Sequence, residues 1–182
     1  MVHENKHEEI LCRAANQAHE GNLPIVLAST TGRTAQEMLR VLGDRRVSLI
    51  VIMHDMRRLP KNSAFDEGVA QRLRQRGDKL LMDRAPWLPS LRITRWLERL
   101  LRISGLNLGE KNLERQYGIG GKVCFLIAAR AAKAGMIQEG QKVIAVAGKQ
   151  AGATTALELC LEKVEPLSIV CSKTIACFNR HS

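Results

Sequence analysis

Two short segments of small polar residues have the composition of an anion-binding loop. The first consists of Ser29, Thr30, Thr31, Gly32, Arg33 and Thr34, and the second runs from Gly148 and Lys149 to Gly152, Ala153 and Thr154. Accessible backbone amides, hydroxyls and one cation per loop are groups that bind a phosphate. Each segment follows an apolar run typical of a buried strand, and strand ends are where open α/β sheets bind ligands. The pattern predicts a phosphate site but no reaction.

The hydroxyls of the first segment have a second explanation. They could cap the helix that follows, but a cap needs one hydroxyl, whereas this segment has four. His54 follows an apolar run at 47–53 and is expected to line the phosphate site formed by the two loops. A histidine at a strand end can equally be a surface residue. Around His54, no other His, Cys or acidic residue stands at a spacing typical of metal ligands, so we expect no bound metal.

Known nucleotide-binding and catalytic patterns do not match the chain. Lys149 follows the first glycine of its loop and not the last, so neither a P-loop nor a dinucleotide fingerprint is present. This excludes an ATPase and a Rossmann dehydrogenase. Cys124 lies near an expected helix start, which could lower the pKa of its thiol, but its apolar neighbours indicate an inert core residue. No catalytic residue is assigned.

The elements that must position these loops follow from hydrophobic periodicity. Apolar residues at 3.6-residue spacing predict helices, and continuous apolar runs predict strands buried on both faces, as in parallel sheets. The expected helices are 5–20, 34–42, 64–75, 91–103 and 122–134, and the expected strands are 24–28, 47–53, 79–82 and 143–147. Residues 104–118 are expected to form a loop or a frayed helix, and residues within 167–171 and 174–178 an added strand or helix.

The segment 155–162 has a different period. Leu157, Leu159 and Leu161 alternate with other residues, which predicts a strand and not a helix. A short loop between two neighbouring strands makes them antiparallel. The second glycine segment is therefore expected to be the tip of a hairpin.

Composition limits the class of protein. The 182 residues are enough for one domain, 45% are hydrophobic, and 28 Lys and Arg against 18 Asp and Glu give a net charge of +10, which favours anionic partners. The five cysteines show no C-x-x-C pair, no secretory leader is recognisable, and no apolar run is long enough to cross a bilayer, so we expect a cytoplasmic protein that does not contact membranes.

A basic region offers an alternative function. Residues 72–102 contain nine Lys or Arg against three Asp or Glu, and the expected helix 91–103 has arginines along one side. This helix could make the chain a scaffold or regulatory module that contacts an acidic protein or nucleic acid. Nucleic acid is the less expected partner, because Trp96 is the only aromatic residue of this helix available for stacking. The apolar stretch 87–101 is also a candidate surface for homo-oligomers.

The order of these motifs resembles stand-alone proteins similar to the C-terminal domain of pyruvate kinase. The resemblance covers about three quarters of the chain. It rests on six short segments at the ends of the expected elements. They are the turn at 28–35, the strand end at 51–54, the connection from a helix into the third strand at 74–81, the helix start at 121–124, the helix end at 134–137 and the strand at 143–148.

The resemblance implies a fold and a ligand. The expected fold is a three-layer α/β/α sandwich with a mostly parallel five-stranded sheet and an antiparallel last strand, in one domain spanning 1–182, with an N-terminal helix in 1–22 and a variable tail at 166–182. The expected ligand is flavin mononucleotide (FMN) or another phosphorylated metabolite. Pyruvate kinase activity is not expected, because the chain has no room for the catalytic barrel of about 250 residues.

Overall fold

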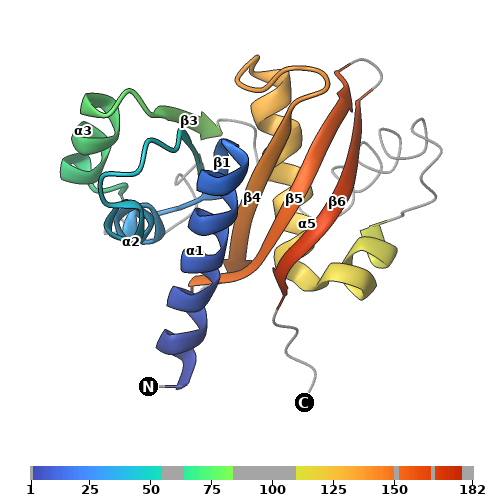
Figure 1. Cartoon of the computed structure of the whole chain (residues 1–182), viewed down its shortest axis with the longest axis horizontal. Helices are drawn as coiled ribbons and strands as arrows, with labels where there is room; N and C mark the ends of the chain where they lie inside the picture. The colour runs from blue at the N-terminus through green and yellow to red at the C-terminus, as the bar shows by residue number, and fades with distance from the viewer. Residues whose placement is uncertain (1, 55–63, 84–109, 150–151, 165–166, 178–182) are drawn as a thin grey trace.

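The computed structural model describes residues 2–54, 64–83, 110–149, 152–164 and 167–177 (Figure 1). The helices in these residues are α1 (Val2–Gly21), α2 (Arg33–Leu42), α3 (Glu67–Gln75) and α5 (Glu110–Lys133). The strands are β1 (Ile25–Ala28), β2 (Leu49–His54), β3 (Lys79–Asp83), β4 (Lys142–Lys149), β5 (Gly152–Lys163) and β6 (Ser168–Cys177).

All six strands form one sheet in the order β3-β2-β1-β4-β5-β6. The pairs β1–β2, β1–β4 and β2–β3 are parallel, whereas β4–β5 and β5–β6 are antiparallel. The expected α/β class with a mostly parallel sheet is thereby confirmed. The sheet has six strands where the resemblance implies five, because the tail adds β6 to the edge of β5.

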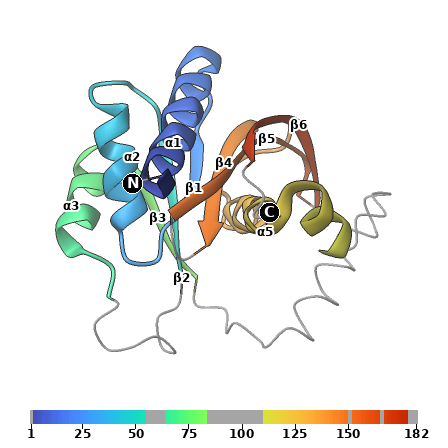
Figure 2. The ribbon, with the colours of Figure 1, turned by 90° about the horizontal axis from the view of Figure 1, so that it is seen from below.

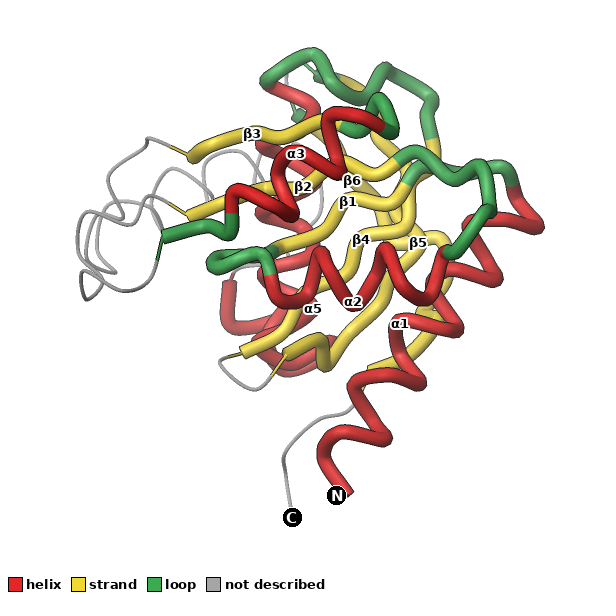
Figure 3. Tube along the Cα trace, turned by 90° about the vertical axis from the view of Figure 1, so that its left-hand side faces the viewer, coloured by secondary structure: helices red, strands yellow, loops and turns green. Residues whose placement is uncertain are grey.

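Helices cover both faces of the sheet. The helices α1, α2 and α3 lie on one face and α5 lies on the other (Figures 2 and 3). Helix α1 contacts α2, β4, β5 and β6, and α5 packs on β1, β4, β5 and β6. Among the described helices, none is both long enough and apolar enough to cross a bilayer.

Successive side chains of each strand point to opposite faces of the sheet, so the core is divided into two hydrophobic clusters. Ile25 and Leu27 of β1 face the α1–α2–α3 side, whereas Val26 faces α5. Because both faces of β1 are buried, its sequence is apolar throughout, as the continuous run predicted. In β5, Leu157, Leu159 and Leu161 all join the cluster under α5, which confirms the period-two interpretation of this segment.

The helix α1 shows the same agreement between pattern and packing. Its apolar positions, Ile10, Leu11, Ala14, Ala15 and Ala18, are all fully buried. The stripe recurs at helical spacing, so a single face of α1 is placed against the sheet and α2.

The helix α5 extends beyond the expected 122–134 segment. Residues from Glu110 onward are helical, which fits the frayed-helix alternative for this part of 104–118. Gly118, with φ 68° and ψ −176°, interrupts the helix in a conformation that is essentially restricted to glycine. The first turns are therefore set at an angle to the long helical segment that follows.

Candidate functional site

The two polar loops lie at the same edge of the sheet. Strand β1 pairs in parallel with β4, with Leu27 opposite Val146, so both strands end at one edge. The segment Ser29–Thr34 continues from β1, and the segment Gly148–Thr154 spans the connection from β4 to β5. Loops separated by more than a hundred residues in sequence are thus neighbours in the fold.

This edge is also the topological switch point of the sheet. The strand order reverses between β1 and β4, since the chain leaves β1 through α2 toward β2 on one side and leaves β4 through the hairpin toward β5 on the other. In open α/β sheets, ligands bind outside the carboxyl ends of strands where the connections diverge in this way. The fold therefore places both candidate loops at the position where a ligand site is expected.

The first loop contains one hydroxyl used for helix capping and three others. Ser29 is buried, with 4% of its surface exposed, and its Oγ accepts a hydrogen bond from the Ala35 amide at 3.3 Å. The capping role proposed for this segment thus falls to Ser29. Thr30 and Thr34 are half-buried and Thr31 is exposed. Their hydroxyls remain the candidates for contacting a ligand.

Gly32 gives the first loop its sharp turn into α2. It precedes the helix with φ 95°, a left-handed conformation that favours glycine. The loop is held by the segment before α3, because the Asp66 amide donates to the Thr31 carbonyl oxygen at 3.0 Å. Asp66 in turn caps α3, its Oδ1 accepting from the Val69 amide at 2.9 Å.

The second loop is the tip of an antiparallel hairpin, as predicted. Gly148 is opposite Ala153, and Lys149 is opposite Gly152, with residues 150–151 outside the described part of the chain. A Cβ at Gly148 would overlap the carbonyl oxygen of Gly152, so this close approach requires glycine. Gly152 itself has φ 105°.

The side chain of His7 connects the two loops. Its Nδ1 accepts a hydrogen bond from the Ala153 amide at 2.7 Å, so Nε2 carries the proton and donates to Glu37 of α2. Glu37 also accepts from Nε of Arg33 at 3.1 Å. The His7 side chain is only 11% exposed. A continuous polar chain therefore runs from the first loop to the hairpin.

The negative charge of Glu37 is stabilised by its hydrogen-bond partners. Burial alone would raise the pKa of Glu37, but hydrogen bonds from His7 and Arg33 and the positive charge of Arg33 lower it below the ordinary value. Arg33 is 74% exposed and so remains accessible to solvent beside the candidate loop.

The hairpin side of the site is closely covered by His7. The Ala153 amide, one of the expected ligand donors, is engaged with His7, and a Cβ on Gly152 would lie 2.7 Å from the Nδ1 atom of His7. A ligand that uses the Ala153 amide must displace this side chain. The sequence pattern did not single out His7, because a lone histidine on an amphipathic helix has no spacing that identifies its distant partners.

The hairpin also contacts the start of the long segment of α5. A Cβ on Gly120 would lie 2.6 Å from Thr154 Oγ1 and would overlap Thr155 Oγ1. The Thr154 hydroxyl, an expected ligand contact, thus lies against α5. Gly120 lets the helix approach the hairpin on the face opposite α1.

His54 and Lys149 stand at strand ends of the same edge. His54 ends β2, the other parallel neighbour of β1, and is in register with Asp83 of β3. Lys149 ends β4. The strand order therefore brings both residues to the edge that carries the two loops.

Cys124 has the properties of an inert core thiol. It is fully buried, and its Sγ donates to the Ala145 carbonyl oxygen at 3.3 Å. Burial raises the pKa of this thiol far above its ordinary value, which opposes formation of a reactive thiolate. Within the described parts of the chain, no group of three or more His, Cys, Asp or Glu side chains is placed to hold a metal ion.

The basic helix expected at 91–103 and the self-association surface expected at 87–101 lie outside the described residues. Only the part of the basic region up to Asp83, which includes the arginines of α3, belongs to the described structure.

The chain has a distant structural likeness to a known protein. No protein-family model matches the chain. A pyruvate kinase from Cryptosporidium parvum is similar with a TM-score of 0.37 and 18% sequence identity, over 83% of this chain and 22% of that one. The chain thus spans about a fifth of the length of the pyruvate kinase chain that it matches.

Proposed function

We propose that this chain is a stand-alone relative of the pyruvate kinase C-terminal domain and that it binds a small phosphate-bearing ligand at the switch point between β1 and β4. FMN or a phosphorylated metabolite is the ligand class. The observation that carries the proposal is the parallel pairing of β1 with β4, since it brings the loops after these strands to one edge of the sheet.

The chemistry of the first loop supports an anion. The N-terminus of α2 carries a partial positive charge, and its N-cap, Gly32, is itself buried beside Phe65 and Asp66. Thr30, Thr31 and Thr34 add hydroxyl donors, because Ser29 alone supplies the cap. Arg33 adds a positive charge at the rim and suits a phosphate oxygen pair.

The hairpin contributes the opposite side of the proposed site. Lys149 and the backbone around Gly148 and Gly152 would approach the ligand from β4 and β5. His7 and Glu37 lie between α1, α2 and the hairpin, so they would hold the two sides at a fixed separation. No group in this arrangement is assigned a catalytic role.

The test is a thermal-shift titration of the full chain with FMN and with a sugar bisphosphate, together with an absorbance spectrum of freshly purified protein for bound flavin. A raised melting temperature with either compound, reduced by at least half in Thr31→Ala, is the expected result. Thr174→Ala, which removes an exposed threonine of β6, is the matched control and should leave the shift intact. No shift with any of these compounds, or an equal shift in Thr31→Ala, would contradict the proposal.

A further inference from the structure

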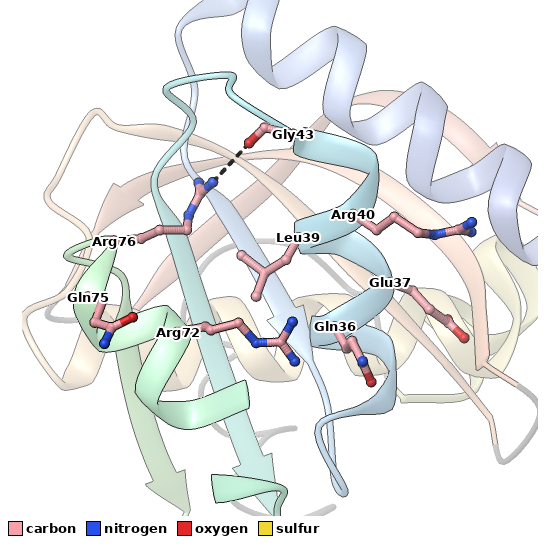
Figure 4. Close-up of a pocket in the computed structure, with 8 residues that line it drawn as sticks. All are labelled: Gln36, Glu37, Leu39, Arg40, Gly43, Arg72, Gln75 and Arg76. Carbon is pink, nitrogen blue, oxygen red and sulfur yellow. Dashed lines mark hydrogen bonds between the residues drawn. The ribbon is translucent and has the colours of Figure 1, made fainter. Parts of the chain in front are cut away.

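A groove of about 820 Å³ lies between α2 and α3, on the outer surface of the helical layer (Figure 4). Gln36, Leu39 and Arg40 line it from α2, and Arg72 and Arg76 line it from α3 and its C-cap. It is separate from the loops at the sheet edge, because these residues lie along the sides of the two helices. The groove is open to solvent and not enclosed, which favours an elongated partner over a buried small molecule.

The three arginines of the groove differ in how their charge is balanced. Arg40 forms an ion pair with Glu8 at 3.0 Å. Arg76 binds Asp78 at 3.0 Å and also donates to the carbonyl oxygens of Gly43 and Val47, so it fixes the connection between α2 and β2 to the end of α3. These two side chains are held in place by the protein itself.

Arg72 is the cation available to a partner. Its Nε donates to the Gly68 carbonyl oxygen at 3.4 Å, and among the described residues it forms no ion pair. Figure 4 shows its side chain extending from α3 across the groove toward α2, where Gln36 and Leu39 lie. A guanidinium positioned in this way presents two terminal amino groups to a carboxylate or phosphate.

The remaining lining residues favour a peptide over a nucleic acid. Gln36 can both donate to and accept from a main-chain amide, and Leu39 offers an apolar contact for a side chain. Among the described residues that line the groove none is aromatic, so they offer a base no stacking platform. The stretch of α2 from Gln36 to Gly43 is roughly 10 Å long, which matches about three residues of extended peptide.

We propose that the α2–α3 groove binds an acidic peptide segment of a partner protein, with a carboxylate of the peptide paired with Arg72 and an apolar side chain on Leu39. Charge complementarity selects the occupant, since Arg72 has no ion pair among the described residues, while Glu37, the carboxylate among the described lining residues, is already bonded to His7 and Arg33. This proposal does not rest on the phosphate-binding function proposed above, although Glu37 borders both places.

The experiment measures fluorescence polarisation of a labelled synthetic peptide of alternating glutamate and leucine, titrated with the full chain. Arg72→Glu is expected to weaken binding about tenfold or more through lost pairing and added repulsion. Arg74→Glu is the matched control: it makes the same charge change on the same helix, but Arg74 pairs with Glu67 and does not line the groove. It should weaken binding by less than about threefold.

Further arms separate the proposed contact from general attraction to a basic surface. A peptide with serine in place of leucine should bind more weakly to the unaltered chain, and melting curves should show that both variants remain folded. Equal loss in Arg72→Glu and Arg74→Glu, or no binding of the peptide at low ionic strength, would overturn the proposal. So would tighter binding of a single-stranded oligothymidine that Arg72→Glu abolishes, because the groove would then be a nucleic-acid site.

Discussion

The Nδ1 atom of His7 accepts a hydrogen bond from the Ala153 amide at 2.7 Å, although the two residues are 146 positions apart in the chain. The same imidazole donates to Glu37, so it joins α1, α2 and the β4–β5 hairpin through one side chain. It does so at the edge of the sheet where the candidate ligand loops lie. The position of the hairpin relative to α2 therefore depends on a residue near the beginning of α1.

Replacing His7 with alanine should loosen the hairpin. The change leaves the Ala153 amide and Glu37 without their partner, and we expect unfolding free energy to fall by about 2 kcal/mol. Urea denaturation gives the global effect, and hydrogen exchange at Ala153 should accelerate more than in β1. His19→Ala, an exposed histidine on the same helix, should change stability by less than about 0.5 kcal/mol. Unchanged exchange at Ala153 would show that the hydrogen bond has no structural role.

The stability of the fold should depend on the charge of Glu37. Because folding lowers the pKa of Glu37, the carboxylate stabilises the folded state above its unfolded pKa of about 4.3, and this contribution is lost as the pH falls through the folded pKa. In Glu37→Gln, stability should be reduced near neutral pH, and the difference from the unaltered chain should shrink in acid. Denaturation across this pH range is the measurement. Exposed Glu20, changed to Gln, is the control, and a constant difference for Glu37→Gln would contradict the argument.

Gly120→Ala should destabilise the contact between α5 and the hairpin. The new Cβ would be forced against the hydroxyls of Thr154 and Thr155, and we expect a cost of about 2 kcal/mol despite the better helix propensity of alanine. Gly68→Ala in α3 is the comparison variant, since its Cβ would lie 3.1 Å from a single atom, the capping Oδ1 of Asp66, and should therefore cost less. If both variants were equally stable in thermal unfolding, the close approach would not be required.

Asp66→Ala should weaken the start of α3 and, through it, the first loop. Loss of the hydrogen bond to the Val69 amide should cost about 1 kcal/mol in unfolding free energy. Exposed Asp44 has no capping role, so Asp44→Ala should be close to neutral in the same chemical denaturation experiment. Hydrogen exchange at Val69 gives a local readout, and unaltered protection there would argue against the cap.

Much of the fold could be predicted because buried apolar residues recur in the sequence with the period of the helix or strand that contains them. The apolar stripe of Ile10, Leu11 and Ala14 predicted α1. The recurrence of leucine at every second position, as at Leu157 and Leu159, identified β5 as a strand. Both patterns are local, so no knowledge of distant contacts was needed. Which parallel strands are neighbours was not predicted, and the parallel pairing of β1 with β4 is known from the structure alone.

The details of the site could not be obtained in the same way. The two loops were identified from composition, but the polar chain from Arg33 through Glu37 to His7 depends on contacts between α1, α2 and β5 that no spacing encodes. Nor did the sequence distinguish Ser29, which caps α2, from the threonines beside it. The kink at Gly118 was missed because a glycine in a polar stretch indicates a turn or a helix interruption equally well.

Helix α1 lies against β5 and β6, which are the last described strands of the chain. During synthesis its apolar face therefore emerges long before its final partners exist. Until residues 152–177 are made, Ile10 and Leu11 are only partly buried, and the nascent chain exposes apolar surface to solvent. Completion of this fold is thus a late event, because the core closes only when the last described strands have been made.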